Sequence, residues 1–385
     1  MQNNKPAIVV IAYNRAKSLQ RLLNTLSKAY YTDSEIQLII SIDKASDNQK
    51  VLEIAQDFKW NFGDKKVDYQ TKNLGLRKHV IKCASLVNEY GSVILLEDDL
   101  FISPQFYNYS CQALNFSENK KSIGGVSLYN HQFNVAAKRN FSPIEDGYDN
   151  WYFQFASSWG QAWTKEQWNT FMNWYDKNQN LTPNPNIPKN VTNWSEKSWL
   201  KYFIHYLVEK DKFFIYPKVS LSTNFNDAGT HINKESSMYQ VSLDYSKEKK
   251  YNFSEIENSL STYDAFFENN TIHKKLNIKK EHLCVDLYGT KDIEKIKKKF
   301  VLSSRIYDFD ILKSFGRLMK PIDSNIWNNV SGEDIFLYDT SKPKKNTNKD
   351  NFYKEMFYSI KHLSRHDARK LFITLYWQRI SKIFK

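Results

Sequence analysis

The first hundred residues alternate between short apolar runs and segments with helical spacing, and this alternation limits the possible folds most strongly. Ala7–Ala12 and Gln37–Ile42 have the length and composition of strands buried on both faces. Between such runs, apolar residues recur three and four positions apart, as on the buried face of a helix. This order predicts a mostly parallel sheet with right-handed crossovers. The expected strands are Ala7–Ala12, Gln37–Ile42, Val67–Gln70 and Ser92–Leu96, and the expected helices carry Leu19–Leu26, Val51–Phe58 and Val80–Val87.

Polar residues follow three of the four expected strands directly. In parallel sheets of this kind, ligands bind beyond the carboxyl ends of the strands. We therefore expect these polar residues to meet at one edge and to form a ligand site. They are Tyr13-Asn14-Arg15, Asp43 and Glu97-Asp98-Asp99.

The acidic triplet at residues 97–99 is the sharpest chemical signal in the sequence. Three adjacent carboxylates repel one another and cost stability unless a cation or hydrogen-bond donors compensate them. Oxygen ligands suit Mg²⁺ or Mn²⁺, which bind one or two carboxylates together with substrate phosphates. A solvated acidic turn is the plain alternative. For Asp43 the alternative is an acid at a helix N-terminus, and for Arg15 it is an ordinary surface arginine.

Composition restricts the class of protein and of partner. Lys plus Arg is 55 against 42 acids, a net charge of +13, which favours nucleic acid, a phosphate-bearing substrate or an anionic membrane as partner. The three cysteines form no CxxC pair, which favours a reducing compartment. The N-terminus resembles no signal peptide, and no apolar stretch is long enough to span a bilayer. We therefore expect a cytoplasmic protein.

Beyond residue 100 the pattern is looser. Seven of the ten tryptophans lie between Trp151 and Trp199. Strands are expected at Ile123–Leu128 and Phe213–Ser222, and helices at Lys165–Asp176 and Lys197–Glu209. The expected organisation is a domain at 1–240 with halves 1–100 and 101–240, an accessory region of unknown role at 250–340, a linker at 341–352 and a basic amphipathic helix at 353–385. The extension C-terminal to the first domain is expected to be mainly helical. That tail carries eight Lys or Arg against two acids, which suits an anionic membrane, although a packed helix with a basic face remains an alternative.

Several motifs together resemble the GT-A glycosyltransferases, a Rossmann-like α/β fold with a mostly parallel sheet flanked by helices. The resemblance covers residues 6–235 and is closest to the Golgi N-acetylglucosaminyltransferases that begin complex N-glycans and to bacterial family 2-like sugar transferases of surface-polysaccharide clusters. The motifs are Ile8–Arg15, Ser41-Ile42-Asp43, Asn73–Leu76, Leu95–Leu100 with Ser103-Pro104 and Phe106, and Phe155–Trp163.

The resemblance implies a role for each matching residue. Tyr13 and Arg15 would help to hold the nucleotide, Asp43 would contact the base or ribose, and Asp98 would lie near the sugar and ribose. Asp99 would bind Mn²⁺ or Mg²⁺. Trp159, in the segment Ser158-Trp159-Gly160, would line the donor-sugar and acceptor cleft. His231, in the late loop Gly229-Thr230-His231, would contact the diphosphate or the metal, against the alternative of a structural histidine.

The catalytic base is the point at which the resemblance fails. An inverting transferase needs a carboxylate to accept the proton of the acceptor hydroxyl. The eukaryotic relatives carry Trp-Asp-Asp-Trp where this chain has Trp194–Trp199, so Glu196 is the only acid in that segment. Asp227 is the second candidate, and Asp146 or Asp149 would follow if neither serves.

The resemblance implies a metal-dependent transferase that moves a hexose or N-acetylhexosamine from a UDP-sugar to a saccharide hydroxyl, with inversion. The acceptor would belong to surface polysaccharide or glycan assembly and would be lipid-linked if the tail lies on a membrane. Three alternatives remain open: a sugar nucleotidyltransferase, which usually has a glycine-rich first loop; a nucleic-acid-binding protein, which would leave the acidic triplet unexplained; and a catalytically inactive relative. We expect no nucleic-acid partner.

Overall fold

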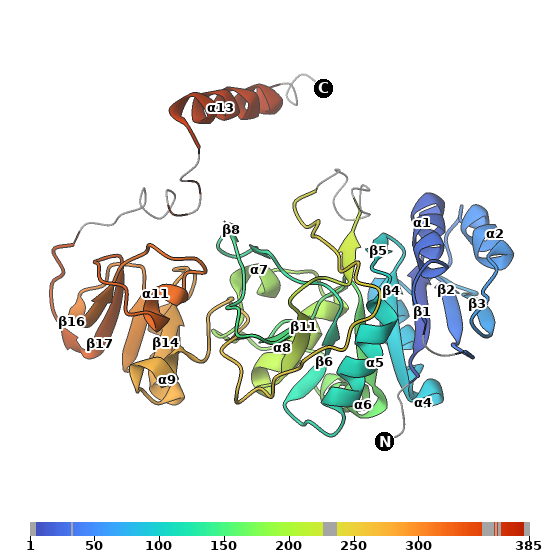
Figure 1. The fold of residues 1–385 in the computed structure, drawn as a ribbon, viewed down its shortest axis with the longest axis horizontal. Helices are drawn as coiled ribbons and strands as arrows, with labels where there is room; N and C mark the ends of the chain where they lie inside the picture. Colours follow the sequence, from blue (N-terminus) through green and yellow to red (C-terminus); the bar gives the residue numbers. More distant parts are fainter. Residues whose placement is uncertain are drawn as a thin grey trace.

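A computed structural model describes residues 5–31, 34–225, 237–348, 358, 360 and 363–380. A nine-stranded sheet forms the centre of the protein, with strand order β13-β9-β11-β6-β10-β4-β1-β2-β3 (Figure 1). Its strands are β1 (Ala7–Ala12), β2 (Leu38–Ile42), β3 (Lys65–Tyr69), β4 (Ser92–Glu97), β6 (Ile123–Ser127), β9 (Asn150–Phe153), β10 (Gln161–Thr164), β11 (Phe213–Pro217) and β13 (Thr262–Tyr263).

The sheet is mostly parallel, as the alternation of the first hundred residues predicts. The strands β3, β2, β1 and β4 pair in parallel, and β10 is antiparallel to both β4 and β6. Since β10 is antiparallel to both of its neighbours, β4 and β6 run in the same direction. The strand β11 is parallel to β6. The carboxyl ends of β1, β4, β6 and β11 therefore lie at one edge.

Successive side chains of β1 enter two separate cores, since neighbouring residues of a strand point to opposite faces. Val9 packs in a core with the helices α3, α4, α6 and α8, whereas Val10 packs in a core with α1, α2 and α5. These helices span α1 (Ala16–Leu26), α2 (Gln49–Asp57), α3 (Leu76–Ala84), α4 (Val87–Tyr90), α5 (Phe106–Ser117), α6 (Lys165–Tyr175) and α8 (Trp199–Glu209), with the short α7 at Lys189–Thr192.

Two expected elements are divided in the structure. The third helix ends at Ala84 and resumes at Val87, because Leu86 N–H bonds to the carbonyl three residues before it and tightens the turn. The strand expected at Phe213–Ser222 ends at Pro217, and a separate strand, β12 (Ser222–Asn224), pairs with β5 (Leu100–Ile102). Proline has no N–H to continue a ladder, so it commonly marks such an end.

The accessory region differs from the mainly helical extension that the sequence analysis expects. Its first part belongs to the central sheet, because β13 (Thr262–Tyr263) pairs with β9. The C-terminal unit, residues 283–348, contains a four-stranded sheet of order β14-β15-β17-β16. Its strands are β14 (Leu283–Asp286), β15 (Phe300–Ser303), β16 (Phe309–Phe315) and β17 (Ile335–Pro343), and its neighbouring short helices are α9 (Ile272–Leu276), η1 (Lys280–His282), α10 (Ile293–Ile296) and α11 (Ser324–Trp327).

The reason is visible in β17, whose first five residues are a buried run of strand length. The lysine-rich segment 291–299 contains only the four-residue helix α10. The linker expected at 341–352 begins inside β17, and Lys344 bonds to Asp308 and Asp310. The described part of the expected linker therefore packs on the sheet.

The helix α13 (Arg365–Ile380) lies within the tail for which the sequence predicts a helix at 353–385, and its apolar residues are not confined to one face. Large apolar side chains occupy six of the seven positions from 371 to 377, and all of these are exposed. On a helix of 3.6 residues per turn, such a run surrounds the axis instead of forming one stripe. No described helix is long and apolar enough to cross a membrane.

We expect Gly125→Val to destabilise the protein by about 1–3 kcal/mol through overpacking. A Cβ at Gly125, in β6, would lie 2.5 Å from the Trp163 ring nitrogen and 2.6 Å from the Phe214 ring. Gly91→Ala is the control, because a Cβ at this position meets nothing within 4 Å. This variant loses only the stability that a non-glycine residue loses at φ +77°. Urea unfolding would measure both; equal stabilities would contradict this packing.

Candidate active site

The ends of β1 and β4 bring the first turn and the acidic triplet together. Ile11 pairs with Glu97, and the Asp98 N–H donates to the Ile11 carbonyl at 3.0 Å. The segments that follow β1 and β4 therefore leave the sheet at the same edge. The sequence analysis predicts that Arg15 and the acidic triplet meet at this edge of the sheet, and the structure confirms that they do.

Arg15 bridges the two aspartates. One guanidinium nitrogen donates to Asp99 Oδ2 at 2.8 Å, and the other donates to Asp98 Oδ1. Burial opposes charge on Arg15, but attraction to Asp98 and Asp99 outweighs it and raises the pKa of the guanidinium. Burial also raises the pKa of Asp98 to about 6, against the opposing effect of Arg15. The arginine is thus the cation that compensates the carboxylates.

Two carboxylate oxygens at this place are buried and have no hydrogen-bond partner among the described residues: Asp98 Oδ2 and Asp99 Oδ1. A buried carboxylate oxygen without a donor is costly, so the arrangement suits an additional cation. The described residues contain no cluster of three or more His, Cys, Asp or Glu side chains able to hold a metal. Mg²⁺ and Mn²⁺ need fewer protein ligands where substrate phosphates complete the shell, so the aspartate pair fits such an ion.

Glu97 differs from its two neighbours. Burial raises its pKa to about 8, and the charges of Asp99 and Asp98 add to this effect while Arg15 opposes it. These effects favour the protonated, uncharged form of Glu97 more than that of its neighbours. Asp98 and Asp99 are therefore the better candidates for anionic ligands.

Asp43 lies at the end of β2 and is buried. Its carboxylate accepts backbone N–H groups from Lys44 at 2.9 Å, Leu74 at 2.8 Å and Gly75 at 2.9 Å. A carboxylate has about four lone-pair positions, so roughly one remains for a ligand. Asp43 therefore fixes the loop before α3 and has limited capacity for a base or ribose hydroxyl.

The turn around Tyr13 is held by Asn48, the residue that precedes α2. The Asn48 amide nitrogen donates to the Tyr13 carbonyl at 2.9 Å and to the Asp43 carbonyl at 2.8 Å. Tyr13 itself is half-buried. The side-chain amide thus connects the turns after β1 and β2. It fixes the position of the two candidate nucleotide-binding segments relative to each other.

Trp159 belongs to an aromatic cluster near the same edge. Its ring lies 4.6 Å from Tyr129 and 5.1 Å from Tyr239, measured between ring centroids. Its carbonyl accepts from Ser222 Oγ at 2.5 Å, which ties it to β12 beside β5. The ring is half-buried, so part of it remains open to a sugar.

Sequence reasoning missed a contact beside the metal-ligand candidates. The Phe225 N–H donates to the Asp99 carbonyl at 3.0 Å, and the Arg21 guanidinium lies 3.7 Å from the centre of the Phe225 ring. The pairing of β12 with β5 brings these residues together. No local pattern distinguishes Arg21 from other helix-surface arginines, so only tertiary structure could reveal it.

Glu196 is placed just before α8, with a side chain that is 64% exposed. It pairs with the Lys201 ammonium and accepts from the Tyr202 hydroxyl at 2.6 Å. These two hydrogen bonds lower its pKa below the usual value. The carboxylate is held in one orientation, although both partners weaken it as a base.

The remaining acids of the sequence analysis have structural partners or lie outside the described residues. Asp146 accepts from Ser259 Oγ at 2.9 Å and from the Leu260 N–H at 3.0 Å. Asp149 accepts from the Asn252 N–H at 2.8 Å. These hydrogen bonds hold the segment 252–260, which leads into β13, against the turn that precedes β9. Asp227 and His231 lie outside the described residues.

Removal of the bridging arginine should destabilise the protein most where no metal is present. Arg15→Gln is expected to lower the free energy of unfolding by about 2–4 kcal/mol in EDTA, because the buried carboxylate of Asp98 and the half-buried carboxylate of Asp99 lose their cation. Mn²⁺ should then raise the melting temperature more for this variant than for the wild type. Differential scanning calorimetry measures both, with the exposed Lys17→Gln as control. Equal melting of all three proteins in EDTA would contradict the compensating role.

A protein-family model and solved structures relate the chain to known proteins. Residues 7–190 match the family model of glycosyl transferase family 2, a range that contains β1 to β4, Arg15 and the aspartate pair. A search of curated proteins finds no match.

Among solved structures, the Pyrobaculum calidifontis mannosyltransferase PcManGT, in complex with GDP-Man and Mn²⁺, is 13% identical with a TM-score of 0.30, over 42% of this chain and 45% of its own. S. aureus TarS 1-349, in complex with UDP-GlcNAc, is 14% identical with a TM-score of 0.34, over 58% of this chain and 60% of its own. The chain thus spans less than two-thirds of either protein. The family match and the mostly parallel sheet together support a GT-A domain, similar to glycosyl transferase family 2, whose enzymes transfer sugar from a nucleotide-sugar donor.

Proposed function

We propose that the chain is a metal-dependent glycosyltransferase that moves a hexose or N-acetylhexosamine from a UDP-sugar to a hydroxyl of a saccharide acceptor, with inversion. The observation that carries this proposal is the bridged pair Asp98 and Asp99 with its two buried, unpartnered oxygens. The family match over the same residues supports it. Surface polysaccharide or glycan assembly is the process we propose for it.

Asp99, assisted by Asp98, would hold Mn²⁺ or Mg²⁺. When bound, such an ion supplies Lewis-acid stabilisation of charge on a leaving diphosphate. Arg15 contributes a permanent cation beside the same carboxylates and would also attract the diphosphate. Tyr13 and Asp43 would position the nucleoside, and Trp159 would offer an aromatic face to the sugar. His231 is proposed as a further contact to the diphosphate.

For the base we propose Glu196, with Asp227 as the second candidate. A general base must come within hydrogen-bond reach of the acceptor hydroxyl, and a fixed orientation helps this. Lys201 and Tyr202 supply that orientation for Glu196. The hydrogen bonds from Lys201 and Tyr202 would have to weaken before Glu196 accepts a proton, since they stabilise its anionic form.

The donor proposal is tested by incubating the protein with UDP-GlcNAc, UDP-glucose, UDP-galactose and GDP-mannose, each with Mn²⁺ and with EDTA. We expect slow release of UDP from at least one UDP-sugar, only with metal. Release of GDP alone would contradict the UDP assignment. Conversion of a nucleotide-sugar and added pyrophosphate into a nucleoside triphosphate and a sugar 1-phosphate would instead indicate a nucleotidyltransferase.

We further propose that the tail places the enzyme on the cytoplasmic face of a membrane, near a lipid-linked acceptor. The exposed side chains of α13 include Phe372 at 71% and Trp377 at 64%, beside the basic residues of the same helix. Exposed aromatic and basic residues together favour the interface of an anionic bilayer.

Phe372→Ser with Trp377→Ser should therefore release the protein from vesicles of phosphatidylglycerol and phosphatidylcholine. The loss of two exposed rings that would insert into the bilayer interface is expected to weaken partitioning by about tenfold or more. Co-sedimentation at moderate salt measures it, and Tyr245→Ser, a 66% exposed aromatic residue elsewhere, is the control. Unchanged sedimentation of the double variant would reject membrane binding by α13.

A further inference from the structure

One arginine in the first turn of α3 reaches the candidate base from another part of the chain. The Arg77 guanidinium carbon lies 4.9 Å from the centre of the Tyr202 ring, and the Tyr202 hydroxyl donates to Glu196 at 2.6 Å. Arg77 belongs to the first hundred residues, which carry the candidate nucleotide-binding segments, whereas Tyr202 belongs to α8. The contact between Arg77 and Tyr202 therefore connects the two halves of the domain beside the candidate base.

The loop that Asp43 holds also places Arg77. The Gly75 N–H donates to the Asp43 carboxylate at 2.9 Å, and the Gly75 carbonyl accepts from the His79 N–H at 3.0 Å. Arg77 lies between these two contacts, at the start of the helix. The carboxylate of Asp43 therefore helps to fix the point from which the Arg77 side chain extends toward Tyr202.

The charge of Arg77 acts on Glu196. The charged and titratable neighbours of Glu196 are Lys201, Tyr202 and His205 on α8 and Arg77 on α3. The hydrogen bonds from Lys201 and Tyr202 lower the pKa of Glu196 most, and attraction to the Arg77 charge lowers it further. Burial lowers the pKa of His205 to about 4, so His205 is uncharged at neutral pH. Arg77 thus helps to keep Glu196 in the anionic form that a base needs.

We propose that Arg77 is a positioning residue that holds Glu196, through Tyr202, in the orientation of a catalytic base. The proposal rests on the proposed transferase function and adds a contribution of the nucleotide-binding half to the proton-transfer step. A side chain that is 64% exposed, as that of Glu196 is, needs such contacts to stay in one orientation. Because cations stack on aromatic faces, the ring of Tyr202 is a suitable intermediary.

The test is single-turnover release of UDP, with Mn²⁺ and with water as acceptor, from the UDP-sugar that releases UDP fastest in the donor assay. Arg77→Gln should lower this rate by about tenfold, since a poorly oriented base slows the chemical step, while the affinity for UDP stays unchanged. Arg77→Lys keeps the charge and should recover most of the rate. Weaker UDP binding by Arg77→Gln would make Arg77 a donor contact and would overturn the positioning role.

The matched control is Lys78→Gln, which removes the same charge from the next, exposed position of α3. It should release UDP at the wild-type rate. An equal loss of rate in Lys78→Gln and Arg77→Gln, or no loss in either, would overturn the proposal.

A double-variant cycle shows whether Arg77 acts through Glu196. In the Glu196→Gln background, Arg77→Gln should lower the rate by less than about twofold, because the base that Arg77 positions is already lost. A tenfold loss in both backgrounds would mean that Arg77 acts independently of Glu196, which overturns the proposal.

The pH dependence of kcat/KM supplies a second readout. Activity falls at low pH as the base gains a proton. Without the Arg77 charge the carboxylate of Glu196 is less stabilised and its pKa is higher, so Arg77→Gln should lose activity at a higher pH than the wild type or Arg77→Lys. An acid limb at the same pH in all three proteins would contradict the action of Arg77 on Glu196.

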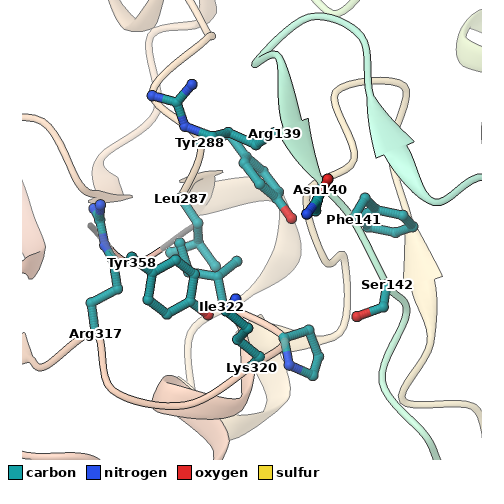
Figure 2. Close-up of a pocket in the computed structure, with 11 residues that line it drawn as sticks. Arg139, Asn140, Phe141, Ser142, Leu287, Tyr288, Arg317, Lys320, Ile322 and Tyr358 are labelled. Atoms are coloured by element: carbon teal, nitrogen blue, oxygen red, sulfur yellow. The ribbon is translucent and has the colours of Figure 1, made fainter. Parts of the chain in front are cut away.

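A pocket elsewhere in the molecule supplies a remote control (Figure 2). It lies between the C-terminal unit and the strand β8 (Arg139–Asn140), which pairs with β7 (Phe133–Asn134), and its described lining includes no residue of α3 or α8. The Lys320 ammonium in this lining lies 5.6 Å from the centre of the Tyr358 ring. Lys320→Gln removes this contact of a cation with a tyrosine ring and should leave the rate unchanged. A loss as large as that of Arg77→Gln would reflect net charge alone and would overturn the proposal.

The wild-type protein separates this proposal from the proposed function. If it releases no UDP from any of the UDP-sugars, the transferase function is contradicted, and the role of Arg77 with it. If it releases UDP and the cycle shows independent losses, only the role of Arg77 is contradicted.

Discussion

Asp99→Ala is expected to abolish Mn²⁺-dependent binding of UDP. The substitution removes one of the two carboxylates that meet Arg15 and one of the two buried oxygens without a partner. Because the ion would rest on few protein ligands, the loss of one should reduce affinity for metal and UDP by about a hundredfold. Free Mn²⁺ measured by electron paramagnetic resonance and UDP measured by equilibrium dialysis report the two effects separately.

Two further variants make this result specific. Asp99→Asn keeps an acceptor for Arg15 while it removes the charge, so it should fold as the wild type does and still bind metal weakly. Asp57→Ala removes an exposed carboxylate at the end of α2 and should change neither measurement. If Asp99→Asn bound Mn²⁺ and UDP as tightly as the wild type, Asp99 would have no role as a metal ligand.

Glu196→Gln is expected to lower the rate of transfer by about 10²–10⁴-fold while it leaves UDP binding intact. Glutamine can still accept from Lys201 and Tyr202, so the local structure should persist, but it cannot take a proton from the acceptor. Single-turnover transfer to an accepted oligosaccharide, compared with UDP titration, distinguishes the chemical step from binding.

The control for this variant is Glu209→Gln, at the other end of the same helix. It should transfer sugar at the wild-type rate. Near-normal transfer by Glu196→Gln would remove Glu196 as the base, and Asp227 would then be the next residue to substitute.

The first four strands could be predicted because each carries its own signal. Residues of β1 are buried on both faces, so the strand reads as one unbroken apolar run, and the polar residues after it mark the ligand edge. The meeting of Arg15 with Asp98 and Asp99 follows from neighbouring strand ends, which the pattern suggests. Its two-point geometry does not follow, because it depends on side-chain conformation.

The C-terminal unit could not be predicted in the same way. Its strands pair across long separations in sequence, as β15 does with β17, and no local pattern in the sequence indicates which strands pair. Arg139 and Lys320 line the same pocket although they lie far apart in the chain, and no local sequence pattern indicates this. The orientation of Glu196 by Tyr202 likewise depends on the turn before α8.

The metal-dependent nucleotide site is tested most directly by calorimetric titration of the wild-type protein with UDP, first with Mn²⁺ and then with EDTA. We expect micromolar binding with the metal and loss of at least about tenfold in affinity without it, because the aspartate pair alone repels a diphosphate. Binding of equal strength in EDTA would contradict the metal site. No binding of UDP or GDP under either condition would contradict a nucleotide-sugar site at this edge of the sheet.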